Sequence, residues 1–157
     1  MTLSLHWDLT ESGNNGVLVF VPGNAVAGDL ESASQRFWAF RRVLDGTSGE
    51  TLRLARALAR SLMRHLDLPA MTAGDFTEAR ANWRVLDAPL GVFARDLAIP
   101  RRTPGVALVL EGPCVNHPDE YRRLLGTDVE VDGRRYPARV QQYADAVVEG
   151  LHDASGR

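Results

Sequence analysis

Hydrophobic and polar residues alternate strictly at the start of the chain, over residues 3–9, which is typical of a half-buried β-strand. A turn-rich segment, ESGNNG at 11–16, comes next, and a continuous apolar run over 17–21 then predicts a second strand that is more deeply buried. Because only a short turn separates the two strands, we expect them to pair as an antiparallel hairpin.

Through the middle of the chain, apolar residues recur every three or four positions, which predicts helices. The first helix is expected between Asp29 and Gly46, and a second one, with the broadest apolar stripe, between Thr47 and Pro69. The same spacing predicts a third helix that begins at Asp75 and ends before Pro89. Leu90, Phe93 and Leu97 indicate a short further helix.

Strand-like patterns return after the PRRTPG segment at 100–105, which is too short to be a domain linker. An apolar run over 106–110 predicts a buried strand, and Pro118 marks the start of a short helix. Asp132-Gly133 is a strong hairpin turn signal between strands at 129–131 and 135–140. Residues 141–151 fit either a helix or a strand, with a slightly better fit to a helix.

Strands at both ends with helices between them predict an α+β fold. We expect a mostly antiparallel sheet, formed by the N- and C-terminal strands, with a layer of three or four helices from the middle of the chain. Residues 1–157 are expected to form a single domain, with 152–157 as a frayed tail.

Composition and charge narrow the classes of function. The net charge is −2, so we do not expect nucleic-acid binding. All 18 basic residues are Arg, which indicates a coding bias toward GC-rich codons. A single cysteine rules out an intrachain disulfide and fits a reducing compartment. No apolar run approaches the length of a membrane span, so we predict a soluble, cytoplasmic protein that does not interact with a membrane.

The loop after the 106–110 run is the densest in chemically reactive side chains. Cys114 and His117 form the sharpest candidate pair, because an imidazole or a helix N-terminus stabilises a thiolate and makes it a nucleophile. Glu111 or Asn116 would orient the imidazole. The alternative is that Cys114 is a small buried apolar residue and His117 only begins a helix.

A second candidate pair lies on the first strand, where His6 and Asp8 project from the same polar face. Combined with Glu111 and His117 they include the side-chain types that bind metals, but no two of them show a recognised metal spacing, so we predict no metal site. The loop 23–28 follows a strand and precedes a helix, yet it lacks the residues of a phosphate-binding loop. We therefore predict no cofactor.

Two surfaces indicate protein binding instead. Four arginines at spacings of three, four and four line one face of the second helix, and no acidic residue one turn away neutralises them: Arg53, Arg56, Arg60 and Arg64. Trp38 falls outside the apolar face of the first helix, as an interface anchor would. The alternatives are an ordinary solvated face and a wide core face, respectively.

These observations favour a non-enzymatic binding or assembly module that self-associates or docks another protein. The alternative is a small cytoplasmic enzyme for acyl transfer or hydrolysis that uses the Cys114–His117 pair. Whether Cys114 and His117 share a pocket decides between them, because a nucleophile and its base must lie within about 4 Å of one another.

Overall fold

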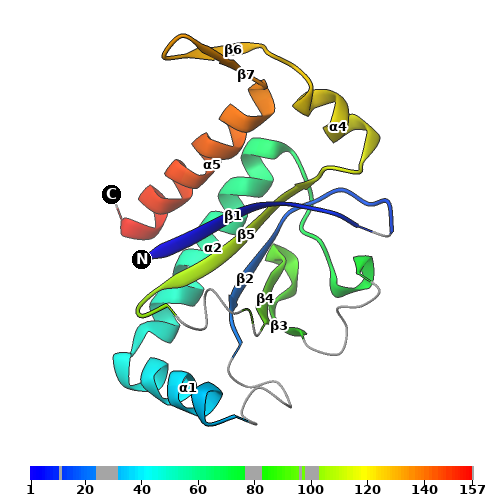
Figure 1. The fold of residues 1–157 in the computed structure, drawn as a ribbon. Helices are drawn as coiled ribbons and strands as arrows, with labels where there is room; N and C mark the ends of the chain where they lie inside the picture. Colours follow the sequence, from blue (N-terminus) through cyan, green and yellow to red (C-terminus); the bar gives the residue numbers. More distant parts are fainter. Residues whose placement is uncertain (11, 24–31, 77–82, 96, 98–102, 157) are drawn as a thin grey trace.

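A computed structural model describes residues 1–10, 12–23, 32–76, 83–95, 97 and 103–156 of the chain (Figure 1). Its strands and helices, in chain order, are β1 (Thr2–Asp8), β2 (Leu18–Pro22), α1 (Ala33–Asp45), α2 (Thr47–Leu66), β3 (Trp83–Asp87), β4 (Val92–Arg95), β5 (Ala107–Cys114), α4 (Pro118–Leu124), β6 (Val129–Val131), β7 (Arg134–Tyr136) and α5 (Ala138–Ser155). Single 3₁₀ turns at Ala73–Asp75 and Ala88–Leu90 lie before and after β3.

The main sheet has five strands in the order β1-β5-β2-β4-β3, and its pairings are mixed. β1 runs parallel to β5 and β2 runs parallel to β4, whereas β2–β5 and β3–β4 are antiparallel. The α+β class is therefore right, but the prediction of a mostly antiparallel sheet is wrong. The described residues contain four α-helices.

The expected hairpin between the first two strands is replaced by insertion of β5 between them. Glu111 of β5 is in register with His6 of β1 on one side and with Leu18 of β2 on the other. The cause is burial: residues 107–110 of β5 are buried on both faces of the sheet, and such a strand is stable at an interior position, where both of its edges are paired.

The third helix and the short further helix are also corrected, because residues Trp83–Asp87 and Val92–Arg95 are paired strands. Short apolar runs do not distinguish a buried strand from a helix, and here the aromatic residues pack better on a sheet surface. Gly91, with φ of 60°, ends the preceding 3₁₀ turn in the left-handed region that glycine tolerates. Asp75, the predicted start of the third helix, ends a 3₁₀ turn, and residues 77–82 lie outside the described residues.

Helices α2 and α5 pack side by side over one face of the sheet (Figure 1). The apolar stripe predicted for the second helix is buried there, with Leu58 and Leu62 inaccessible to solvent against Leu110 of β5. Residues 141–151 are helical, within α5, and this helix continues through Ser155 into the expected tail. The hairpin predicted around Asp132-Gly133 is present as β6–β7, a separate two-stranded sheet that connects α4 to α5 (Figure 1). The predicted second strand, 135–140, is wrong in its last part, because β7 ends at Tyr136 and residues 138–140 begin α5.

Helix α1 is present as predicted, but its apolar face is not buried among the described residues. Phe37, Phe40 and Leu44 are 55%, 64% and 67% exposed. Its contacts are with α2 rather than with the sheet, because α1 precedes α2 at the end remote from the core (Figure 1).

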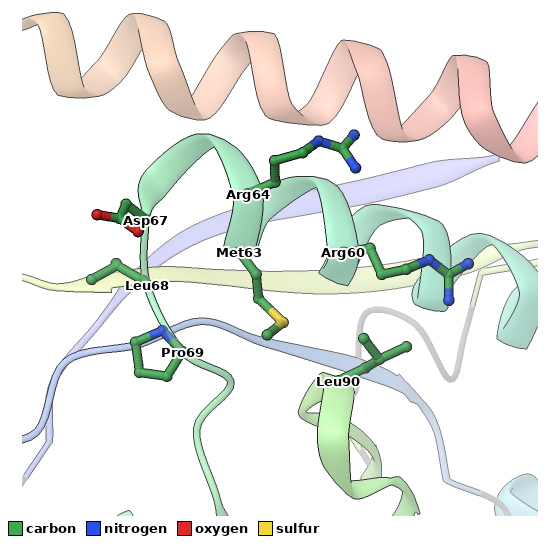
Figure 2. Close-up of a pocket in the computed structure, with 7 residues that line it drawn as sticks. All are labelled: Arg60, Met63, Arg64, Asp67, Leu68, Pro69 and Leu90. Carbon is green, nitrogen blue, oxygen red and sulfur yellow. The ribbon is translucent and has the colours of Figure 1, made fainter.

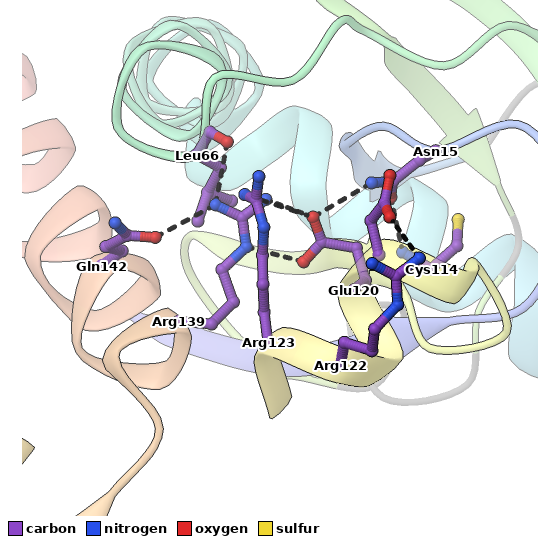
Figure 3. Close-up of polar contacts among 9 residues, drawn as sticks. Asn15, Leu66, Cys114, Glu120, Arg122, Arg123, Arg139 and Gln142 are labelled. Carbon is purple, nitrogen blue, oxygen red and sulfur yellow. Dashed lines mark hydrogen bonds and ion pairs between the residues drawn. The ribbon is translucent and has the colours of Figure 1, made fainter. Parts of the chain in front are cut away.

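A buried ion pair fixes α4 against α5 below the end of β5 (Figure 3). Glu120 and Arg139 are 1% and 2% exposed, and the guanidinium donates to both carboxylate oxygens, at 2.7 and 2.5 Å. Arg139 also donates to the carbonyl oxygen of Leu66 at the end of α2. Asn15 completes the network, because its amide donates to Glu120 and its carbonyl oxygen accepts from the backbone of Cys114.

Replacing Glu120 with Gln should lower the free energy of unfolding by about 3–5 kcal/mol, because it leaves the Arg139 charge buried without its partner. Chemical denaturation measures this change. Arg123→Gln is the matched control, since Arg123 faces the same carboxylate at 3.7 Å but is 55% exposed, and its loss should cost under about 1 kcal/mol. Equal effects of the two substitutions would contradict the assignment of the network as a buried anchor.

The contact between α2 and α5 requires glycine at position 150. A Cβ at Gly150 would lie 2.9 Å from Cα and Cδ2 of Leu58, so Gly150→Ala should destabilise the fold by about 1–3 kcal/mol. A Cβ at Gly49, in the first turn of α2, would meet no atom within 4 Å. Gly49→Ala should therefore stabilise the fold by about 0.5–1 kcal/mol, and thermal unfolding of both variants would reveal the opposite signs.

Candidate functional site

His6 and Glu111 meet at the junction of the two parallel strands β1 and β5. The two residues are in register, and Nδ1 of His6 lies 3.6 Å from Oε1 of Glu111. The His6 side chain is 48% exposed, whereas that of Glu111 is 13% exposed. One partner of this pair is thus open to solvent and the other is largely withdrawn from it.

The electrostatic setting of Glu111 changes its proton affinity. Burial, first, and the negative charge of Asp8 together raise its pKa to about 7, against the opposing positive charge of Arg95. Burial also raises the pKa of Asp8, against a hydrogen bond from the backbone of Leu9 and the charges of Arg95 and His6. Glu111 therefore exchanges protons near neutral pH, as a general acid-base group must.

The orientation of the pair is held from two sides. Oγ of Ser4 lies 2.8 Å from Nε2 of His6, on the same face of β1. From the opposite face of the sheet, the Tyr143 hydroxyl of α5 donates to the carbonyl oxygens of Leu110 and His6, at 3.1 and 3.4 Å. Tyr143 thereby links the backbones of both strands at the level where the two side chains meet.

Arg95 belongs to the same electrostatic group, although it comes from β4. Its guanidinium lies over the rings of Phe20 and Trp83, with centroids 5.4 and 5.1 Å from Cζ. Its carbonyl oxygen accepts a hydrogen bond of 2.8 Å from the backbone of Gly23. A Cβ at Gly23 would lie 2.8–3.0 Å from backbone atoms of Arg95, so only glycine permits this approach.

The predicted Cys114 and His117 pair is in a different environment. Cys114 is fully buried, its thiol contacts Sδ of Met71 at 3.6 Å, and burial raises its pKa to about 11. The thiol is therefore protonated near pH 7. His117 begins α4, as predicted, and the contact recorded between the two residues is the backbone hydrogen bond from His117 to the Cys114 carbonyl.

The two proposed orienting groups also have other partners. Asn116 exchanges two hydrogen bonds with the backbone of Thr10, donating at 2.6 Å and accepting at 3.3 Å. Glu111 faces His6 rather than His117. Nδ1 of His117 is buried without a partner among the described residues. Glu111 therefore belongs to a group with His6 and Asp8 and not to the predicted site around Cys114.

The arginine stripe of α2 is partly neutralised by acidic residues that are distant in sequence. Arg56 is paired with Asp87 at 2.7 Å, and Arg64 is paired with Glu149 and Asp153 of α5. Arg53 and Arg60 are exposed. Trp38 is partly buried and makes an edge-on contact with Phe37, at 5.3 Å between ring centroids. Their role in partner binding stays a prediction.

A pocket of about 450 Å³ lies elsewhere, between the C-terminal end of α2 and the turn before β4 (Figure 2). It is lined by Arg60, Met63, Arg64, Asp67, Leu68, Pro69 and Leu90. A second, of about 330 Å³, lies beside the Glu120–Arg139 pair. Neither pocket includes His6, Asp8 or Glu111, so the candidate site is identified by its charges and contacts and not by cavity size.

Ligand-type side chains in the described ranges form no group of three or more that could hold a metal ion. His6 and Glu111 are the two at the candidate site that zinc accepts as ligands. Among the same residues, no helix has the length and apolar character needed to cross a membrane.

No protein-family model matches this sequence, and no curated protein matches it. Solved structures do share the fold. The N-acetylmuramyl-L-alanine amidase Ami1 from Mycobacterium smegmatis matches 98% of this chain with a TM-score of 0.60 and 19% identity. Ami1 from Mycobacterium abscessus matches 97% with a TM-score of 0.59 and 19% identity. The CwlD amidase from Clostridioides difficile, solved in complex with the GerS lipoprotein, matches 98% with a TM-score of 0.56 and 13% identity.

In each case the match covers 53% of the other protein, so the chain spans about half the length of these structures. All three are named as amidases. This finding corrects the prediction of a non-enzymatic binding or assembly module, and with it the expectation of protein binding and homo-oligomer formation. At these identities the likeness establishes the fold, and the chemistry has to be argued from the residues.

Sequence reasoning paired His6 with Asp8 and considered Glu111 beside them only as a metal-ligand type, and it did not predict that Glu111 lies next to His6. The necessary information was the parallel pairing of β1 with β5, across about 100 residues of chain. Arg95 was missed because its segment was assigned to a helix. Its signal was the alternation of Phe93 and Arg95, which places both on one face of a strand.

Asp8→Asn should lower the pKa of Glu111 from about 7 toward its ordinary value, because a neutral neighbour no longer opposes ionisation. Titration of the Glu111 carboxyl by carbon-13 NMR measures the shift. Asp128→Asn, which removes the same charge from an exposed position outside the site, should leave that titration unchanged. An unchanged pKa in Asp8→Asn would show that burial alone sets the proton affinity of Glu111.

Proposed function

We propose that this chain carries an amide-hydrolysing site, with Glu111 as the group that moves the proton. The observation that carries the proposal is a half-buried carboxyl with a pKa of about 7, beside His6, in a fold shared with amidases. The two mycobacterial proteins are named N-acetylmuramyl-L-alanine amidases. We therefore take the amide between an N-acetylmuramyl group and L-alanine as the substrate class.

Hydrolysis of an amide needs one group that first accepts a proton and then returns it. In the proposed reaction the Glu111 carboxylate takes a proton from a water molecule, whose oxygen bonds to the amide carbon. The carbon–nitrogen bond then breaks, and the Glu111 carboxylic acid gives that proton to the departing amine. The products are a carboxylic acid and free L-alanine. A carboxyl with a pKa near the working pH suits both halves of this exchange.

His6 is proposed as a positioning residue. Ser4 fixes one nitrogen of its ring, and the other faces Glu111, so the imidazole limits where the carboxyl group can turn. Asp8 contributes by charge, because it keeps the pKa of Glu111 high enough for the protonated form to persist near neutrality.

The buried thiol is not needed in this reaction. A pKa of about 11 keeps Cys114 protonated, and a protonated thiol is a poor nucleophile. Hydrolysis through Glu111 therefore replaces the Cys114–His117 chemistry as the proposal.

Glu111→Gln should reduce release of L-alanine from N-acetylmuramyl-L-alanine by about 10²–10⁴-fold, since an amide does not accept the proton of water. Mass spectrometry of the released amino acid gives the rate. Glu130→Gln removes an exposed carboxyl of β6 and should leave the rate unchanged. The assay is run in metal-free buffer and with added Zn²⁺, because His6 and Glu111 are zinc-ligand side chains. No difference between wild type and Glu111→Gln in either buffer would contradict the proposal.

The pH dependence gives a second readout. Because the base must be ionised, kcat/KM of the wild type should rise with pH through about 7 and level off above it. Asp8→Asn should move the midpoint of this rise to lower pH. A midpoint that stays fixed in Asp8→Asn would indicate that another group controls the reaction.

A further inference from the structure

We propose that Arg95 forms a binding subsite for a substrate carboxylate, next to the amide that Glu111 would hydrolyse. This inference rests on the proposed function, because it assigns the part of the substrate that lies beside the reacting bond. Helices α2 and α5 pack on one face of the sheet, and the opposite face carries a second apolar cluster.

One sheet face carries both Arg95 and the Glu111 group. Phe20, Phe93 and Val109 pack together there, apart from the core under α2 and α5. Alternate residues of a strand share a face, so Glu111 lies on the side of Val109 and Arg95 on the side of Phe93. The charge of Arg95 acts on Glu111 and Asp8, in agreement with this placement.

The guanidinium is held by two aromatic rings. Cζ of Arg95 lies over the rings of Phe20 and Trp83, and cation–π contacts of this kind place an arginine without using its N–H groups as hydrogen-bond donors. Arg95 forms no side-chain hydrogen bond or close ion pair with any residue in the part of the chain that the structure describes. A guanidinium that is held in this way, and whose donors bind no other side chain among the described residues, is suited to bidentate binding of a carboxylate.

Strand positions give the span between the two groups. Pro22 of β2 is in register with Arg95, and Leu18 of β2 is in register with Glu111. Across the sheet, Arg95 and Glu111 are therefore separated by two strand spacings, about 10 Å, and along the strands by four residues, about 13 Å. The arginine side chain leans back over Phe20 and shortens this distance. The two offsets combine to about 16 Å between the backbones, which the Arg95 and Glu111 side chains and the substrate between them have to bridge. We assign the bound carboxylate to the residue after the alanine, because in an extended peptide it lies about 7 Å from the reacting amide, farther away than a carboxylate of the alanine itself. The ligand class is therefore an acyl peptide with a free carboxylate, and not a neutral amide.

Binding of two matched compounds tests the subsite. The probes are N-acetylmuramyl-L-alanyl-glycine and its C-terminal carboxamide, titrated calorimetrically into Glu111→Gln protein so that neither is hydrolysed. We expect the free acid to bind about tenfold or more tightly than the carboxamide. Adding Arg95→Gln should abolish this preference, and Arg95→Lys, which keeps the charge without the planar fork, should retain only part of it.

Arg53→Gln is the matched control, since it removes the same charge from an exposed position on α2 and should keep the full preference. Circular dichroism confirms that each variant is folded, and Arg95→Lys decides the matter if Arg95→Gln is not. A preference that survives both Arg95 substitutions would overturn the inference. So would equal binding of the two compounds to the parent protein, or no binding of either.

Measuring kcat/KM for hydrolysis of the same two compounds separates this inference from the proposed function. If Arg95 only balances the charge of Glu111 and Asp8, then Arg95→Gln changes the pH profile equally for both compounds and leaves their kcat/KM ratio unchanged. If it binds the carboxylate, the ratio falls toward one. Absence of hydrolysis in the wild type contradicts the proposed function, while the binding titrations still decide the role of Arg95.

Discussion

The parallel pairing of β1 with β5 is the constraint on which the candidate site depends. It places His6 in register with Glu111, two residues that are remote in the chain, and a shift of one residue would turn one of them to the opposite face. β5 takes an interior position in the sheet, between β1 and β2, because its apolar run is buried on both sides. The placement of Glu111 in a partly dehydrated position, and hence its raised pKa, follows from that burial.

Polar contacts at the middle and at the carboxyl end of β5 hold this register. Tyr143 donates to the carbonyl oxygens of both strands at the level of the site. At the carboxyl end, Asn15 binds the backbone of Cys114 and joins it to the Glu120–Arg139 pair, which also reaches α2 through Leu66. The helices are thus connected to the strand that carries Glu111 by specific hydrogen bonds as well as by apolar packing. Because each of these groups is buried, any movement of the strand would leave a polar atom without its partner.

Local patterns predicted the local elements: the strand over 3–9, the helix over α2, the start of α4 at His117 and the Asp132-Gly133 turn all agree with the structure. Two kinds of feature could not be predicted from the sequence. The sheet order depends on which buried strands take interior positions, and no residue near the first turn indicates that β5 lies between β1 and β2. The apolar spacing of the β3–β4 segment fits both a helix and a strand. The packing of Phe20 against Trp83 and Phe93 is a tertiary contact, which local spacing does not predict. Cys114 was a candidate because thiols are reactive, but burial keeps this thiol protonated and lowers its reactivity.

Glu111 also links the stability of the fold to the acidity of the solution. Its ordinary pKa of 4.5 is raised to about 7, so between those values the folded chain holds a proton that the unfolded chain has released. In that window the unfolded state binds fewer protons, and each rise in pH therefore favours unfolding at this position, whereas below 4.5 both states are protonated and the penalty vanishes. The raised pKa of Asp8 acts in the same direction. The carboxyl pair proposed to transfer protons at this edge of the sheet thus lowers the stability of the fold at the pH at which it would work.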